Sequence, residues 1–427
     1  MCLILINFSA IKKLDLYFLY LISQRYSLNN FYNFIVNKIT SFLIFFAKYF
    51  VQTIQNECTL LFALFIISLL KYCIMKSPTI MSYFLFIFIA GMSNIANSQN
   101  IIPIENLKYH KIYKSLDEAL QNVENVYILD LSYAKLNTLP EGLWKLSNLR
   151  VLYLYGNGLK TVPAEIKNLK LLQEIYLNNN FVTTVAPEIG FLSNLQVLSL
   201  SQNKLQSLPI EIGKLTNLKQ LYLSENLIAK LPSTLGNLAA LQELDVSYNK
   251  LIELPSEVVK LRNLKMLYLA ENELTYLPAG FAQLQQLNEV YIDDNNLKDL
   301  ATVTGAMNSL KYFSVVNNDI TTLGAGFTAS SLKYLYLSGN KLLELSNTIS
   351  RYKSLKVLDI SSNMIKELPL SLFELPDLEN LNLSKNEFIA LPIEISRLKS
   401  LKEVGISKNS KLTVIPTILY NNKYKLY

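Results

Sequence analysis

Cysteine and histidine are scarce in this chain of 427 residues, and their scarcity limits the chemistry that it can perform. The three cysteines, Cys2, Cys58 and Cys73, all lie near the start, so the rest of the chain has no disulfide framework and no thiol nucleophile. The single histidine, His110, is interpreted as a surface residue. The sequence also has no GxxxxGKS/T phosphate loop, nucleophile elbow, HExxH motif or CxxC pair. We therefore expect no enzyme activity, no cofactor and no metal site.

Charge is equally sparse, because only 17% of the residues are charged. The net charge of +7 is unevenly placed: residues 1–98 carry seven basic and two acidic side chains, which gives +5 and leaves +2 for residues 99–427. The nearly neutral remainder has no basic surplus of the kind that binds nucleic acid, so we predict no nucleic-acid partner.

Glycine and proline are absent from residues 1–74, which is unusual because turns in globular domains depend on them. Two interpretations remain open. The segment forms membrane or membrane-surface helices, with apolar runs at Ser41–Phe50 and Thr59–Leu70, or the start of translation has been placed too far upstream. The first interpretation predicts membrane attachment through these segments.

The next segment, residues 75–98, favours the second interpretation. Met75 and Lys76 begin a short basic region, Met81–Ala90 is apolar, and small residues Ala96 and Ser98 precede Gln99. This order is typical of a cleavable secretory signal peptide, which predicts a secreted or cell-surface protein. The alternative is an uncleaved signal anchor.

A short capping helix is predicted in the segment 99–125, which leads into the rest of the chain. Ser115 precedes Asp117 and Glu118, the pattern of a helix N-cap. Leu116, Ala119, Leu120 and Val123 fall on one face of that helix, so it covers the open end of the following array.

A nine-residue phrase, LKQLYLSEN at Leu218–Asn226, recurs with a period of 23 residues and one step of 22. A period of this length indicates a stacked repeat architecture. Thirteen units fill residues 126–420, and residues 421–427 remain as a C-terminal tail for which we identify no clear cap. The final asparagine of the phrase recurs at Asn157, Asn180, Asn203, Asn226, Asn249, Asn272, Asn295, Asn318, Asn340, Asn363, Asn386 and Asn409.

The full unit, LxxLxLxxNxLxxLPxxIxxLxx, resembles the leucine-rich repeat family. A Leu-Pro or equivalent step in its second half, as at Leu208-Pro209 and Leu254-Pro255, is similar to the Ras-group-related subclass. The resemblance implies an α/β solenoid, a curved array with a parallel sheet on its concave face. For the subclass, it implies an intracellular or membrane-tethered signalling scaffold.

Each part of the unit has a physical role in such an array. In LKQLYL, Leu221 and Leu223 alternate with Gln220 and Tyr222, so a strand with inward leucines is predicted. The recurring asparagine is expected to bond backbone groups of its own turn and of the adjacent one, because a buried amide must be satisfied. The Leu-Pro step turns the chain onto the convex side, where an irregular or short helical segment follows.

Function must therefore depend on the variable residues of the strands. The position between the two inward leucines is tyrosine in six of thirteen units, and the position two residues earlier adds two more tyrosines. Tyrosine is favoured at protein interfaces, although neighbouring aromatic rings also stabilise sheets. The predicted partner-binding residues are Tyr153, Tyr176, Tyr222, Tyr268, Tyr291, Tyr312, Tyr334 and Tyr336.

Two further features leave alternatives open. Carboxylates share the concave face, at Glu174, Glu243, Asp245, Glu289, Asp293 and Asp294. Without tight ligand spacing, they favour a polar rim over a metal site. Units between Leu300 and Tyr352 lack the Leu-Pro step, which reflects either sequence drift with a local change of curvature or a kink that shapes the binding face.

The sequence thus predicts a non-catalytic module, exported or membrane-attached, that binds a protein or peptide ligand on its concave face. The alternative is the intracellular or membrane-tethered scaffold that the subclass implies.

Overall fold

The protein is described from a computed structural model, which covers residues 104–107, 109–300, 303–324, 326–420 and 424–427. These residues belong to one of two structural units, Ile101–Tyr427. The predicted segments 1–74 and 75–98 lie outside the described residues, as does the start of the segment 99–125. Within the described ranges, no helix is both long enough and apolar enough to span a bilayer.

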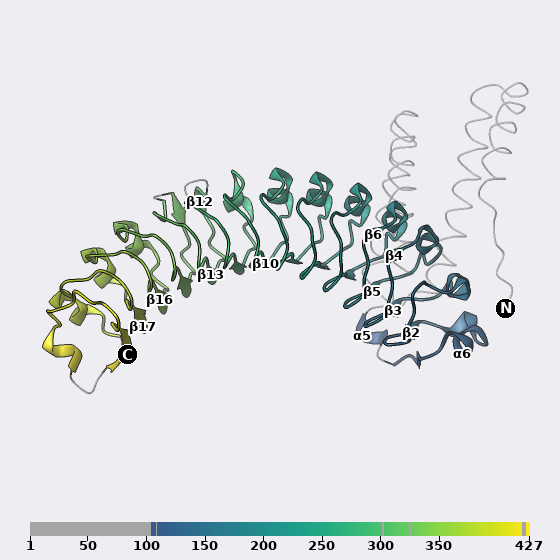
Figure 1. Cartoon of the computed structure of the whole chain (residues 1–427), viewed down its shortest axis with the longest axis horizontal. Helices are drawn as coiled ribbons and strands as arrows, with labels where there is room; N and C mark the ends of the chain where they lie inside the picture. The colour runs from purple at the N-terminus through teal and green to yellow at the C-terminus, as the bar shows by residue number, and fades with distance from the viewer. Residues whose placement is uncertain (1–103, 108, 301–302, 325, 421–423) are drawn as a thin grey trace, which may run out of the picture. The chain divides into compact units, whose positions relative to one another are not determined.

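Alternating side chains give every repeat a short strand. In β8 (Gln220–Tyr222), Leu221 is fully buried between partly exposed neighbours. Leu221 aligns in parallel register with Leu198 before it and Leu244 after it, so successive leucines stack inside the array. The result is a parallel sheet on the inner side of the arc of repeats (Figure 1), as predicted.

The main sheet has fifteen strands, thirteen from the predicted units and one added at each end. The remaining four strands form two small pairs on the outer side. The main strands, in order, are β1 (Ile112–Tyr113), β2 (Ile128–Asp130), β3 (Val151–Tyr153), β5 (Glu174–Tyr176), β7 (Val197–Ser199), β8, β9 (Glu243–Asp245), β10 (Met266–Tyr268), β11 (Glu289–Tyr291), β13 (Tyr312–Ser314), β15 (Tyr334–Tyr336), β16 (Val357–Asp359), β17 (Asn380–Asn382), β18 (Glu403–Gly405) and β19 (Lys425–Leu426).

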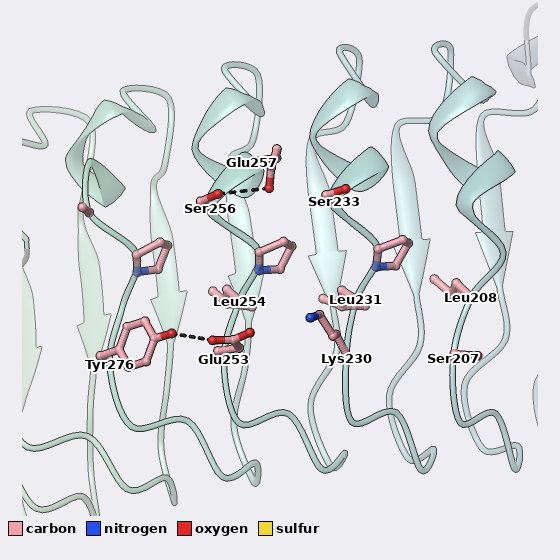
Figure 2. A pocket seen from close by; sticks show the side chains of 14 residues that line it. Ser207, Leu208, Lys230, Leu231, Ser233, Glu253, Leu254, Ser256, Glu257 and Tyr276 are labelled. Carbon is pink, nitrogen blue, oxygen red and sulfur yellow. Dashed lines mark hydrogen bonds between the residues drawn. The ribbon is translucent and has the colours of Figure 1, made fainter.

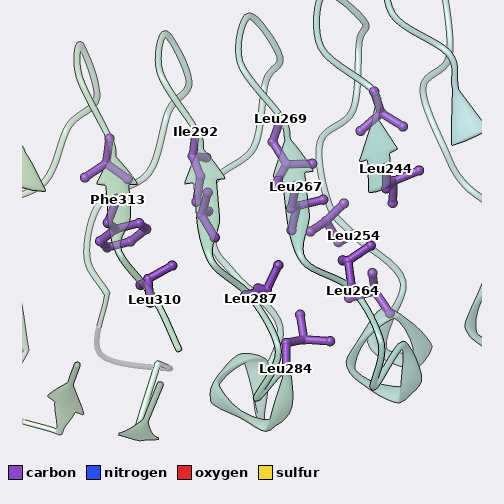
Figure 3. Close-up of a cluster of buried hydrophobic side chains, with 14 of the residues drawn as sticks. Leu244, Leu254, Leu264, Leu267, Leu269, Leu284, Leu287, Ile292, Leu310 and Phe313 are labelled. Atoms are coloured by element: carbon purple, nitrogen blue, oxygen red, sulfur yellow. The ribbon is translucent and has the colours of Figure 1, made fainter. Parts of the chain in front are cut away.

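A single hydrophobic core runs through the array behind the sheet. Figure 3 shows its middle, where Leu244 and Leu267 project from the neighbouring strands β9 and β10, and Phe313 from β13. They point toward leucines that precede the strands, such as Leu264 and Leu287. Each unit buries residues only against its neighbours, so the core is continuous but one-dimensional.

The convex side is built from short 3₁₀-helices that follow the proline step. Pro255, for example, has φ −62° and precedes η7, in which Val258 is buried. The helices are η2 (Glu141–Lys145), η3 (Ala164–Asn168), η4 (Pro187–Phe191), η5 (Ile210–Lys214), η6 (Ser233–Asn237), η7 (Ser256–Lys260), η8 (Phe281–Gln283), η9 (Asn347–Arg351), η10 (Leu370–Glu374), η11 (Ile393–Arg397) and η12 (Thr417–Tyr420).

The recurring asparagines form the expected ladder. Asn226 is buried, and its amide nitrogen donates to the carbonyls of Leu223 in its own unit and Leu200 in the preceding one, at 3.0 and 2.9 Å. Its Oδ1 accepts from the N–H of Leu205, also in the preceding unit, at 2.9 Å. The other ladder asparagines repeat this pattern with two local changes: Asn318 donates to Val316 within its own unit, and the Oδ1 of Asn409 accepts from the N–H of Asn386. The ladder thus holds adjacent units together.

The residue before each ladder asparagine adopts a left-handed backbone, which the sequence pattern did not indicate. The slot holds Gly156 and Gly339 in two units but bulky residues such as Tyr248 and Lys385 in others, both with φ 55°. Such a conformation is unfavourable outside glycine. The turn is therefore maintained by the ladder and the packing around it.

A short helix precedes the first unit. Helix α6 (Leu116–Leu120) starts at Ser115, whose Oγ accepts from the N–H of Glu118 at 3.1 Å, and its Ala119 is fully buried. The short η1 (Val123–Asn125) follows. At the other end, where we identified no cap, β19 pairs with β18 and extends the sheet.

The units that lack the proline step differ only on the outer side. On that side of these units, β12 (Gly305–Ala306) pairs with β14 (Phe327–Thr328). A similar small pair, β4 (Thr161–Val162) with β6 (Thr184–Val185), lies in earlier units of the array. Phe327 contacts Tyr352, whose hydroxyl donates to the carbonyl of Phe327 at 3.2 Å. The register of the main sheet continues unbroken through these units. The 22-residue step is thus absorbed on the convex side.

Candidate ligand-binding surface on the concave sheet

The first and third residues of each main strand face the concave side, and the predicted tyrosines occupy these positions. All eight are partly buried, because each ring lies against its neighbours on adjacent strands. They do not form one continuous column. The structure divides them into a covered pair, a single ring and a group of five.

The covered pair is Tyr153 and Tyr176, whose rings stack with centroids 5.0 Å apart and planes 13° apart. Both pack against a small cluster of Ile128, Val151 and Leu107. Leu107 belongs to the helix α5 (Ile104–Leu107), which precedes the array. The N-terminal segment therefore covers this end of the concave face, and no repeat-based signal in the sequence indicated that contact.

The single ring is Tyr222. Its register neighbours are Ser199 and Asp245, so no aromatic ring lies beside it in its column. Its hydroxyl donates to the Glu243 carboxylate at 2.9 Å. Tyr222 is therefore fixed by a polar contact rather than by stacking.

The group of five is named here the tyrosine patch and consists of Tyr268, Tyr291, Tyr312, Tyr334 and Tyr336. The rings of Tyr268 and Tyr291 stack with their centroids 5.0 Å apart and their planes 11° apart, and the ring centroids of Tyr291 and Tyr312 are 4.6 Å apart. The ring centroid of Tyr312 also lies 5.2 Å from that of Tyr336 and 6.0 Å from that of Tyr334. The patch is thus a continuous aromatic surface across β10, β11, β13 and β15.

Carboxylates border the patch. The hydroxyl of Tyr291 donates to Glu289 at 2.9 Å. Asp293 accepts from the hydroxyl of Ser314 and from the N–H of Val316, the latter at 2.8 Å. Of the predicted acidic set, Glu174 lies away from this group, where it accepts from Tyr176 at 2.9 Å.

Burial determines the ionisation of these groups. Burial raises the pKa of Tyr312 to about 12, and burial with the nearby Glu243, Glu289 and Asp245 raises the pKa of Tyr268. Burial also raises the pKa of Asp293, although its bonds from Ser314 and Val316 oppose that shift. Tyr268 and Tyr312 therefore stay neutral at physiological pH, and Tyr291 presents its hydroxyl group beside the Glu289 carboxylate.

The described residues contain no group of three or more His, Cys, Asp or Glu side chains arranged to hold a metal ion. A groove of about 640 Å³ lies along the proline steps and includes Lys230, Glu253 and Tyr276. Figure 2 shows that these side chains come from successive units, with the hydroxyl of Tyr276 bonded to Glu253 at 2.5 Å. Leucines and prolines of successive repeats line this groove together with these variable side chains.

Comparisons with known proteins agree with this architecture. A family profile described as leucine-rich repeat region matches residues 175–249. A second, described as leucine rich repeat, matches residues 239–297, 285–342 and 353–410. A third, described as leucine rich repeats in two copies, matches residues 147–189. A leucine-rich repeat protein of Leptospira interrogans is 30% identical, with TM-score 0.54, over 74% of this chain and 100% of its own. This chain belongs to the leucine-rich repeat family. The Ras-group-related subclass stays a prediction.

More distant structures share the fold. The ectodomain of the plant membrane receptor kinase GASSHO1/SCHENGEN3 from Arabidopsis thaliana, solved in complex with CASPARIAN STRIP INTEGRITY FACTOR 2, is 24% identical with TM-score 0.54. This match covers 72% of this leucine-rich repeat chain but only 43% of that one. A TDR receptor is 21% identical with TM-score 0.59, over 74% and 61% of the two chains. A search of curated protein sequences finds no match.

Proposed function

We propose that this leucine-rich repeat protein is a non-catalytic interaction module whose protein or peptide ligand docks on the concave face at the tyrosine patch. The observation that carries the proposal is the continuous group of five partly exposed tyrosines. Large rings with polar tips bury much area on binding while they lose little conformational freedom, because neighbouring rings already fix them. The complex of the GASSHO1/SCHENGEN3 ectodomain supports the proposal by analogy of fold.

Sheet support is the competing explanation for the tyrosines. It suffices for Tyr153 and Tyr176, whose rings stack and pack against the cluster that includes Leu107. It explains less of the patch, where five rings form one group and none packs against the cluster around Leu107. We therefore place the ligand over the patch and treat Tyr153 and Tyr176 as structural.

Panning of a phage-displayed library of random peptides tests this function. The bait is the full chain as recovered from expressing cells, compared with a variant in which Tyr268, Tyr291 and Tyr312 of the patch are replaced by serine. The matched control replaces the exposed Tyr109, Tyr276 and Tyr420, which lie outside the main strands. We expect peptides that bind the wild type and the control but not the first variant. The proposal is contradicted if the patch variant, with the same circular dichroism spectrum as the wild type, enriches the same peptides.

Export through residues 75–98 is part of the proposal, and the layout of that segment supports it. Mass spectrometry of the mature N-terminus tests it. A first residue at or near Gln99 is the expected result. Peptides recovered from residues 1–74 would instead favour the membrane-tethered or intracellular scaffold.

A further inference from the structure

We propose that the ligand is an extended peptide segment rich in lysine or arginine, seated across β9, β10, β11, β13 and β15. This inference rests on the proposed function and specifies the chemistry of its ligand. The concave positions of these five strands hold tyrosines, carboxylates, one methionine and one serine, and no basic residue. The surface is therefore both aromatic and anionic.

The carboxylates of this region have no cationic partner among the described residues, unlike two acids nearer the C-terminal end of the sheet. Toward the C-terminus, Glu379 pairs with Lys356 at 3.0 Å and with Lys402, and Glu403 pairs with Lys425 at 3.2 Å. Glu243 and Glu289 instead accept only from neutral groups, namely tyrosine hydroxyls and a glutamine amide. Their charge is not neutralised by ion pairs within the described chain.

Lysines do occur beside this region, one residue before the strands. Lys265 donates to the side chain of Gln242 at 3.1 Å, and Lys311 and Lys333 are exposed. These residues lie at the edge where the strands begin. The anionic groups of Asp245 and Asp293 lie at or beyond the opposite ends of their strands. Glu243 and Glu289 begin their strands, but their carboxylates accept from the hydroxyls of Tyr222 and Tyr291, which stand at third strand positions. A cationic segment is therefore best placed over the third strand positions, within reach of both sets of carboxylates and away from the lysine edge.

The tyrosine rings suit the same ligand. Tyr268 stacks on Tyr291 with one face, and on the other side its register neighbour is Asp245 of β9, which has no ring. Glu289 accepts from the hydroxyl of Tyr291 beside them. A cation over an aromatic face gains attraction from the ring quadrupole, and a guanidinium group can also stack and bond a carboxylate through two N–H groups. Aromatic and anionic groups thus act on one cation together, whereas an acidic ligand is repelled.

The length of the surface sets the size of the segment. Four spacings separate β9 from β15, which is roughly 19 Å at about 4.8 Å per strand. An extended chain covers that distance in about six residues at roughly 3.3 Å each. A peptide of about ten residues therefore spans the region with a margin at each end.

Fluorescence anisotropy with three synthetic peptides of about ten residues tests the inference, the length following from strand geometry. Threonine alternates with lysine, glutamate or glutamine in the three peptides, and each is titrated with the full chain. We expect the lysine peptide to bind about tenfold more tightly than the glutamine peptide, the combined effect of two or three exposed ion pairs. We also expect the preference to weaken between about 0.05 M and 0.5 M salt, because exposed charges are screened.

Two variants with the same change in net charge make the test local. Glu243→Gln with Glu289→Gln removes the unpaired carboxylates and is expected to abolish the preference for lysine. Glu379→Gln with Glu403→Gln removes acids that already pair with lysines and is expected to leave it intact.

The outcomes separate this inference from the proposed function. Equal binding of the lysine and glutamine peptides, or equal effects of the two variants, overturns the cationic ligand. If panned peptides still require the tyrosine patch in that case, the concave interaction surface stands and only its ligand chemistry is wrong. Loss of patch dependence in the panning overturns both.

Discussion

Replacement of Asn226 by alanine tests the ladder that joins adjacent repeats. Its Oδ1 is the acceptor for the N–H of Leu205, at 2.9 Å. Its amide also donates to the carbonyls of Leu200 and Leu223, but each of these accepts a second ladder amide, from Asn203 and Asn249. The substitution therefore leaves one buried N–H without its acceptor and removes one of two bonds from each carbonyl.

The expected loss follows from this accounting. An unsatisfied buried N–H costs about 1–3 kcal/mol, and each half-satisfied carbonyl adds about 0.5 kcal/mol, so unfolding should become easier by roughly 2–4 kcal/mol. Asn217 provides the control, because it is exposed and its amide makes one bond, to the carbonyl of Ser193 at 2.8 Å. Asn217→Ala should cost about 0.5 kcal/mol, as is typical of surface substitutions.

Urea unfolding measures both losses. Circular dichroism follows the whole array, and fluorescence of the single tryptophan, Trp144 in η2, follows the first repeat. Coincident transitions are required before the free energies are compared, since repeat arrays can lose cooperativity.

Paired substitutions sharpen the test. Asn226 and Asn249 share the carbonyl of Leu223, so the double alanine variant should lose more than the sum of the single losses. Asn226 and Asn295 share no acceptor, and their losses should add. A loss for Asn226→Ala no greater than that of the exposed control refutes the ladder as a source of stability.

Three further predictions concern other parts of the array. Gly236→Ala places a Cβ 2.4 Å from the backbone oxygen of Glu257 in the next unit. Thermal unfolding should therefore show a loss of about 1–3 kcal/mol in the free energy of unfolding. An unchanged melting temperature contradicts the close approach. Tyr352→Phe removes the buried bond to the Phe327 carbonyl and should cost about 1–3 kcal/mol by urea unfolding, whereas a neutral effect would show that this bond is not needed. Burial raises the pKa of Asp293, so its charge opposes folding once the pH exceeds that pKa. Asp293→Asn should therefore be more stable than wild type at neutral pH. The difference in stability should shrink as the pH falls and Asp293 takes up its proton. A difference that grows in acid contradicts this sign.

Much of the fold followed from the sequence because the repeat combines two strong local signals. Alternation around Leu221 and Leu223 predicts the strand, and the ladder asparagines predict the turn that follows. The left-handed residue before each asparagine was not predictable from residue type, since Tyr248 and Lys385 occupy the slot. The contacts of the ladder enforce that conformation.

The candidate surface was predicted only as a set of positions. The sequence placed eight tyrosines on one face, but it could not show which of them meet. Stacking depends on register between strands, and that register pairs Tyr312 with Tyr334 and so places Tyr312 diagonally beside Tyr336, across units of unequal length. The cover of Leu107 over the first strands depends on a segment outside the repeat pattern.

By itself, the sequence determined the family, the parallel sheet and the face that carries the variable residues, because a 23-residue period repeats each local instruction many times. Only the tertiary structure divided the tyrosines into a covered pair, a single ring and the tyrosine patch. It also showed that Glu243 and Glu289 have no cationic partner among the described residues while Glu379 has two. These distinctions depend on contacts between adjacent repeats. The sequence pattern of one repeat does not show which side chains of the next repeat lie beside it.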